Sequence, residues 1–151
     1  EKNKEIEECI KTLRLVIEKN GNESQALNFL GYLYAEKGEN LNEAEQLIRR
    51  ALKVRPKDGY YLDSLGWVFY KKKSYDKALT YLLLAKKFFE ESKKGDTTGY
   101  AVILDHIGDV YFAKSMYEKA LYYFKKAVEI ANDETFQSTI KKKITKVEES
   151  L

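Results

Sequence analysis

The sequence predicts an all-α fold, an α-solenoid of about eight helices in which antiparallel helix pairs stack side by side. Helix-forming Lys, Glu, Leu and Ala dominate the 151 residues, which include one Pro and 8 Gly. Apolar residues recur at helical spacing along the chain. The same pattern of small and large apolar residues returns after about 34 residues, and such a period indicates repeated units that bury their apolar faces against each other.

The clearest unit spans residues 59–92 and contains two apolar runs separated by the polar segment 71–74. Either run alone would leave an apolar face exposed, so the two together predict an antiparallel helix pair. Gly66 lies inside the first run, where glycine costs about 1 kcal/mol of helix propensity relative to alanine. We therefore expect another helix to approach closely at Gly66. The two runs consist of Leu62, Leu65 and Phe69, and then Ala78, Leu82 and Ala85.

Copies of this unit lie on both sides of it. Ala44, Ala78 and Ala120 are each followed seven residues later by another alanine. The pattern resembles the tetratricopeptide repeat, a 34-residue helix-turn-helix unit with the motif L-x2-L-G-x2-Y and a late proline, here Pro56. The resemblance covers roughly residues 6–131, although leucine replaces the aromatic residue that usually opens the motif. It implies a superhelix of helix pairs. The flanking motifs are Leu27, Leu30, Gly31 and Tyr34, and Leu104, Ile107, Gly108 and Tyr111.

We expect one domain over residues 1–151. Its predicted segments are the second helix of a truncated repeat (6–23), three full repeats (24–58, 59–92 and 101–134), an insertion between the last two (93–100) and a C-terminal capping helix (135–151).

The boundaries of the repeats carry capping and turn signals. Ser24 is expected to cap the helix that follows it, and residues 56–59 are expected to form a turn. In the insertion we expect residues 88–94 to extend a helix and residues 95–99 to form a turn. One of Asp96, Thr97 or Thr98 would then cap the next helix.

The N-terminal segment 6–20 resembles the second helix of a repeat whose first helix is missing. Its expected apolar stripe would need cover, so we expect the native protein to continue upstream, with a simple N-terminal cap as the alternative. Pairing of this stripe between two chains, as a homodimer, is a further possibility. The stripe consists of Ile6, Cys9, Leu13 and Val16.

The C-terminal segment predicts one amphipathic helix that caps the array. Lys141, Lys142 and Lys143 are expected on its solvated face and not in a nucleic-acid site. The expected apolar stripe consists of Phe136, Ile140, Ile144, Val147 and Leu151.

Composition excludes several classes of protein. The net charge is only +3, which favours neither nucleic acid nor a membrane surface as a partner. No apolar run approaches the roughly 18 residues of a membrane span. The single cysteine, Cys9, excludes an internal disulfide.

Chemistry-bearing residues are sparse, and we predict no enzyme, no cofactor and no metal site. Cys9 and His106 are the only Cys and His, and they lie at opposite ends of the array. Asp105 and Asp109 share one helical face, which we expect to be a solvated acidic face.

In the family, the first helix of each pair lines a concave groove. The resemblance therefore implies a peptide-binding groove that displays Asn28, Phe29, Tyr32, Tyr60, Asp63, Ser64, Trp67, Tyr70, Asp105, His106, Asp109 and Phe112.

Trp67, the one tryptophan, has two interpretations: an exposed aromatic hot spot with Phe29, Tyr32 and Tyr70, or a side chain packed on adjacent helices. The aspartates of the groove add negative potential, so we expect a protein or peptide partner with apolar and basic residues. A clamp for an acidic peptide tail, known in the family, is disfavoured because among the corresponding residues only Asn28 keeps the family type.

The predicted function is a protein–protein interaction scaffold or adaptor. The alternatives are a self-assembly module that pairs through the N-terminal helix, and a fragment of an envelope tethering lipoprotein. The last rests on strings such as ALNFLGYLYAEKG, which resemble repeat segments of bacterial envelope lipoproteins. We expect a soluble domain of the bacterial cytoplasm or cell envelope, with the compartment left open.

Overall fold

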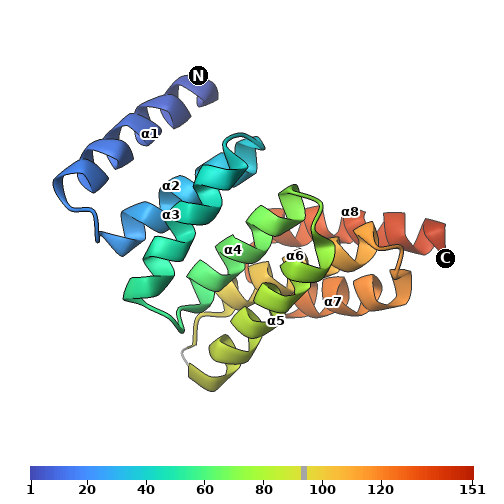
Figure 1. Ribbon diagram of the computed structural model, residues 1–151. Coiled ribbons are helices and arrows are strands. Elements are labelled where there is room, and N and C mark those ends of the chain that lie inside the picture. Colours follow the sequence, from blue (N-terminus) through green and yellow to red (C-terminus); the bar gives the residue numbers. More distant parts are fainter. Residues whose placement is uncertain (93–94) are drawn as a thin grey trace.

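The computed structural model describes residues 1–92 and 95–151, and this part of the chain consists of eight α-helices (Figure 1). The predicted all-α solenoid is thereby confirmed. The helices are α1 (Lys2–Lys19), α2 (Ser24–Lys37), α3 (Leu41–Val54), α4 (Gly59–Lys71), α5 (Tyr75–Ser92), α6 (Thr97–Ala113), α7 (Tyr117–Ile130) and α8 (Glu134–Ser150).

Three antiparallel pairs, α2/α3, α4/α5 and α6/α7, form the body of the array. The expected close approach at Gly66 is confirmed, because a Cβ on Gly66 would lie 2.6 Å from Leu82 Cγ of α5. Leu65 and Leu82 are fully buried at this crossing. Glycine therefore lets large side chains of the second helix pack directly onto the backbone of the first.

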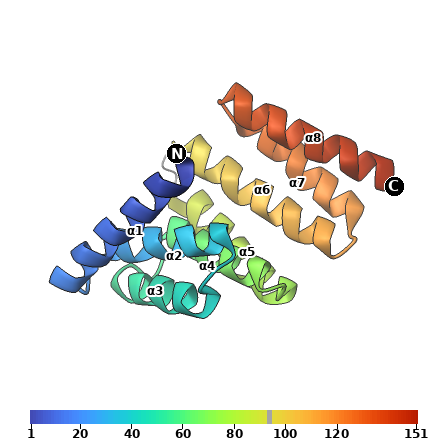
Figure 2. The same cartoon turned by 90° about the horizontal axis from the view of Figure 1, so that it is seen from above.

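The first helices of the pairs form an inner row, in which α2 contacts α4 and α4 contacts α6. Figure 2 shows α1 to α3 on one side of the molecule and α6 to α8 on the other, with α4 and α5 between them. We call the side of α2, α4 and α6 that faces away from α3, α5 and α7 the inner face.

The end of each first helix has the same turn. Gly38, Lys73 and Ser115 adopt left-handed backbone conformations, with φ of 69°, 63° and 59°. After Lys73, the amide of Ser74 donates to the carbonyl of Phe69 at 2.9 Å. This is the Schellman arrangement, which satisfies carbonyls at a helix C-terminus.

The helix starts agree with the expectations in two of three places. Asp58 accepts from the amides of Tyr60 and Tyr61 and so caps α4 after the predicted turn, and Asp96 accepts from the amide of Gly99 and caps α6. Ser24 was expected to cap α2, which is wrong.

The Ser24 hydroxyl instead lies 3.0 Å from the Tyr61 hydroxyl of α4, because burial of Ser24 places it against the next repeat. The insertion differs too, since α6 begins at Thr97 and includes Gly99. A helix was expected to extend over residues 88–94. It is present as far as Ser92, where α5 ends, and residues 93 and 94 lie outside the described part.

The two terminal helices cover the ends of the array. In α1, Ile6, Ile10, Leu13 and Ile17 pack on the core, whereas Val16 is 37% exposed. The expected stripe was therefore wrong at Val16, since only the side of α1 that faces α2 is covered. In α8, Ile140 and Val147 are fully buried, but Leu151, which follows α8, is 65% exposed, contrary to expectation. None of the helices described here combines the length and apolar character of a membrane span.

Candidate partner-binding face

The predicted groove residues all lie on α2, α4 and α6, yet they differ in exposure. Phe29 and Tyr60 are 48% and 49% exposed. The half-buried members are Asn28, Tyr32, Tyr70, Asp109 and Phe112. The buried members are Asp63, Ser64, Trp67, Asp105 and His106.

Trp67 of α4 is only 8% exposed. Its ring stacks between His106 and Tyr70, with centroid distances of 4.0 Å and 4.5 Å. Its Nε1 donates to Glu36 Oε1 of α2 at 2.6 Å. The interpretation of Trp67 as an exposed hot spot is therefore wrong, because the tryptophan fills the space where α4 meets its neighbours in the inner row.

His106 of α6 is buried beside Asp63 of α4, with 2.8 Å between Nδ1 and Oδ1. Burial disfavours the charged imidazole. The charge and hydrogen bond of Asp63, with the charges of Asp105 and Asp109, outweigh burial and raise the pKa of His106 above its usual value.

Asp105 and Asp109 do not form a solvated acidic face, and that expectation is wrong. Asp105 is 6% exposed, and Lys143 Nζ of α8 lies 2.9 Å from an oxygen of each carboxylate. Lys143 was expected on a solvated face, which is also wrong, because α8 lies where this lysine reaches α6. The sequence alone does not distinguish Lys143 from its neighbours Lys141 and Lys142.

Four carboxylates, those of Glu36, Asp63, Asp105 and Asp109, take part in the contacts around Trp67, His106 and Lys143. Burial and the charge of Asp105 raise the pKa of Asp109 to about 6, although Lys143 opposes the shift. Burial and the charges of Glu36 and Asp63 raise the pKa of Tyr32 strongly. We call Glu36, Asp63, Trp67, Asp105, His106, Asp109 and Lys143 the inner polar cluster.

Other predicted residues lie outside this cluster. Tyr60 packs edge-on against Phe89 of α5, with 5.1 Å between ring centroids, so it contacts the second helix of its own pair. Phe112 lies beside Tyr117, with Lys146 Nζ 5.5 Å from its ring centroid. Asn28 Oδ1 is buried and has no hydrogen-bond partner among residues 1–92 and 95–151.

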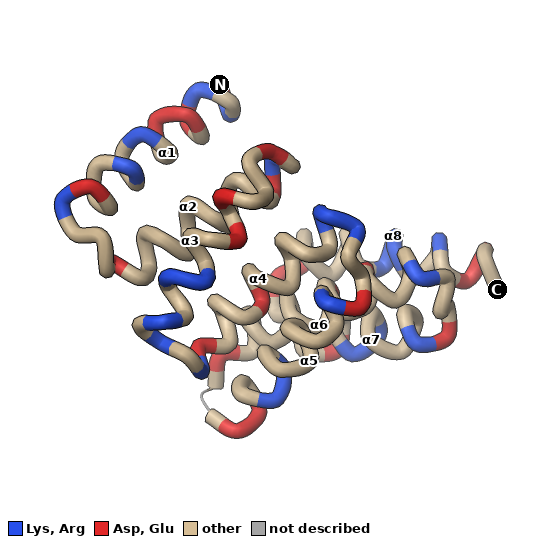
Figure 3. Tube along the Cα trace, viewed as in Figure 1, with Lys and Arg blue, Asp and Glu red and all other residues tan. Residues whose placement is uncertain are grey.

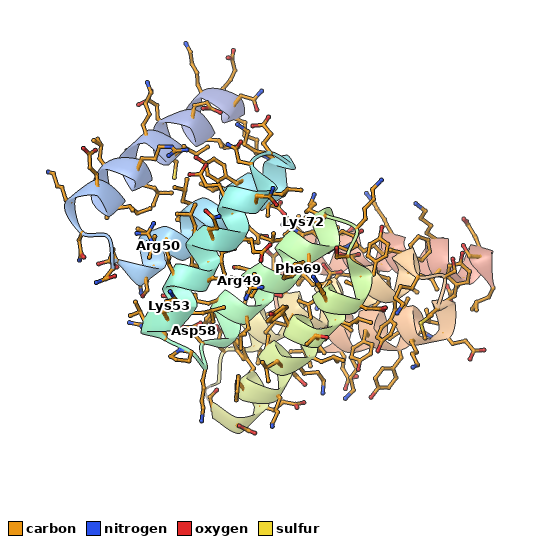
Figure 4. All side chains as sticks on the ribbon, viewed as in Figure 1. Arg49, Arg50, Lys53, Asp58, Phe69 and Lys72 are labelled. Carbon is orange, nitrogen blue, oxygen red and sulfur yellow. The ribbon has the colours of Figure 1, made fainter. Side chains whose placement is uncertain are left out.

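Cations gather on other parts of the surface, including the turn between α4 and α5 and the C-terminal half of α3 (Figure 3). There Lys72 reaches Glu45 of α3 at 2.7 Å. The guanidinium of Arg49 and Lys72 Nζ lie 5.9 Å and 5.7 Å from the Phe69 ring centroid (Figure 4). These contacts join the first two repeats away from the inner face.

Stacked helix pairs with a row of first helices define a helical repeat protein. Two family profiles, both described as tetratricopeptide repeat, match residues 24–58 and 60–133. The chain belongs to the tetratricopeptide repeat family. Proteins built from these repeats generally mediate protein–protein interactions and are typically non-enzymatic scaffolds.

One curated relative is the TPR repeat-containing protein PA4667 of Pseudomonas aeruginosa. It is 38% identical over 82 residues, which is 54% of this chain and 14% of that protein. The match thus spans a small part of the relative. A similar solved structure is the N-terminal domain of stress-induced protein-1 (STI-1) from C. elegans, with a TM-score of 0.65, 15% identity and coverage of 83% and 94% of the two chains. It supports the fold alone.

Proposed function

We propose that this chain is an interaction scaffold or adaptor whose inner face binds a peptide or protein surface that carries apolar and basic side chains. The observation that carries the proposal is that half-buried aromatic residues lie on the same helices as the carboxylates of Glu36, Asp63, Asp105 and Asp109. These aromatic residues are Tyr32 and Tyr70.

The aromatic residues supply apolar contact area. Each is partly covered in the folded chain and keeps part of its ring accessible. Aromatic side chains bury a large area at a low cost in conformational entropy, which is why they dominate interface energies.

The carboxylates favour a basic partner. Asp109 is the most accessible of the three aspartates, with 13% of its side chain exposed, and Glu36 is an exposed residue. Burial, and after it the charge of Asp105, raise the pKa of Asp109 although Lys143 opposes the shift. A cation approaching this face would be attracted, and an acidic peptide would be repelled.

A random peptide library screened against the chain tests the proposal. We expect selected peptides to combine Lys or Arg with apolar residues, and Tyr32→Ala with Tyr70→Ala to weaken their binding at least about tenfold. Tyr122→Ala is the matched control, because Tyr122 is 56% exposed on α7, which is not part of the inner row. Selection of acidic peptides, or equal losses for inner and outer variants, would contradict the proposal.

Self-assembly is a second candidate, supported by exposed apolar residues on α1. Leu15 is 59% exposed and Val16 37% exposed. If these residues pair between chains, sedimentation will show a dimer that Val16→Asp dissociates. A monomer at all concentrations removes this candidate.

A further inference from the structure

His106 lies at the junction between the second and third repeats. Its ring stacks on Trp67 with an interplanar angle of 17°, and Nδ1 contacts Asp63. Trp67 in turn hydrogen-bonds to Glu36. The imidazole is therefore the middle of a chain of contacts that links α6 through α4 to α2.

The same chain of contacts continues to the C-terminal helix. Asp105 precedes His106 in α6, and its carboxylate accepts from Lys143 Nζ of α8 at 2.9 Å and 3.1 Å. The inner polar cluster thus connects four helices through polar and aromatic contacts. Among these side chains, histidine is the type whose ordinary pKa lies nearest neutral pH.

The charge balance of the cluster depends on His106. With a charged imidazole, two cations, His106 and Lys143, face Asp63, Asp105 and Asp109. With a neutral imidazole, Lys143 alone remains among these five groups, and it contacts only the carboxylates of α6. Asp63 of α4, buried against His106, then loses its counter-charge, and a buried carboxylate without a counter-charge is destabilising.

We propose that His106 forms a pH-sensitive contact between the second and third repeats. The contact holds the two repeats together when the imidazole is charged and lets them move apart when it is neutral. The inner face is then narrower at acidic pH than at alkaline pH, whatever partner it binds.

Above neutral pH, none of the other titratable groups that the structure describes around His106 opposes the change in charge that its deprotonation produces. Burial raises the pKa of Tyr32 and of Tyr70, so both stay uncharged near neutral pH. Neighbouring carboxylates outweigh burial and raise the pKa of Lys143, which stays charged. Asp109 titrates at about 6, and its ionisation with rising pH adds repulsion in the same direction.

His106 is the one histidine of the chain and Trp67 its one tryptophan. Imidazole resonances and tryptophan emission therefore each report on a single residue of this contact. Imidazole resonances, tryptophan emission and the small-angle scattering radius of gyration would be followed from about pH 5.5 to about pH 9. We expect His106 to titrate above 6.5. Emission should rise at the same midpoint, because a charged imidazole stacked on indole quenches it, and the radius of gyration should increase.

Two variants and one control test whether His106 is the group that makes the contact between the repeats pH-sensitive. His106→Gln should abolish the coupled changes above neutral pH, and Asp63→Asn should lower the midpoint. Glu129→Gln should change nothing, because Glu129 is exposed on α7, away from the inner polar cluster. A radius of gyration that stays constant while His106 titrates would overturn the proposal, as would a midpoint at or below 6.5. If Asp63→Asn fails to fold, the wild-type and His106→Gln profiles suffice.

Discussion

Lys143 of α8 lies 2.9 Å from both Asp105 and Asp109 of α6. These pairs are 38 and 34 residues apart in the chain, so the contact exists only because α8 packs back along the last repeat. The C-terminal helix therefore does more than cover apolar surface: it partly neutralises the inner face.

Replacing Lys143 by methionine should destabilise the fold, because two largely buried carboxylates lose their shared cation while the aliphatic stem is kept. We expect a loss of about 2 kcal/mol, less than the 3–5 kcal/mol typical of a fully buried pair, since 31% of the lysine side chain is exposed. Urea unfolding followed by circular dichroism measures it. Lys141→Met, an exposed neighbour, is the control, and equal stabilities for the two variants would contradict the role of Lys143.

Asp109 should make stability depend on pH in an unusual direction. Its pKa in the folded chain is raised from 3.8 to about 6, so the folded chain holds this proton more tightly than the unfolded chain. The stabilising contribution is therefore complete below about pH 3.8 and is lost as the pH rises through about 6. We expect Asp109→Asn to flatten the stability profile in this window, as measured by denaturant unfolding at a series of pH values. A profile with an unchanged slope would exclude Asp109 as its source.

Gly66→Ala should destabilise the protein although alanine is the better helix former. The added Cβ would lie 2.6 Å from Leu82 Cγ and 3.2 Å from the Ala78 carbonyl oxygen. Overpacking of this kind costs about 1–3 kcal/mol, more than the roughly 1 kcal/mol gained in helix propensity. Thermal unfolding should show a lower midpoint for Gly66→Ala and little change for Gly95→Ala, where no atom lies within 4 Å. A midpoint that rises for Gly66→Ala would show that the helices can separate without cost.

Lys73→Gly should stabilise the turn between α4 and α5. Lys73 has φ of 63°, and glycine occupies the equivalent position 38 in the preceding repeat. Left-handed conformations cost non-glycine residues about 1 kcal/mol, so we expect a gain of up to about 1 kcal/mol in the free energy of unfolding. Lys77→Gly, within α5, should instead be destabilising. A loss of stability for Lys73→Gly would show that the lysine side chain contributes more than the backbone costs.

The helices and their pairing could be predicted because they depend on local spacing. Gly66, Ala78 and Ala85 recur at fixed positions, and each position specifies which face a helix must bury. The turn at residues 56–59 followed from the same local chemistry, since Asp58 caps a helix through amides two and three residues ahead of it.

The inner face could be predicted only as a set of positions. The family resemblance implied that Tyr32, Trp67 and Asp105 lie on the groove side of the first helices, but it does not say how closely neighbouring repeats pack. Trp67 is buried because Glu36 of α2 and His106 of α6 lie against it, and Asp105 is buried where Lys143 of α8 reaches it. Tyr60 instead packs against Phe89 of α5.

The sequence by itself determined the repeat, the helix pairs and the positions where small residues allow close packing. These follow from interactions within about one repeat length, where residue type and spacing are sufficient. Tertiary structure alone decided that His106 meets Asp63, that Trp67 is buried and that Lys143 partly neutralises Asp105 and Asp109. Those contacts depend on the angle and distance between successive repeats, which are set by the packing of whole helices.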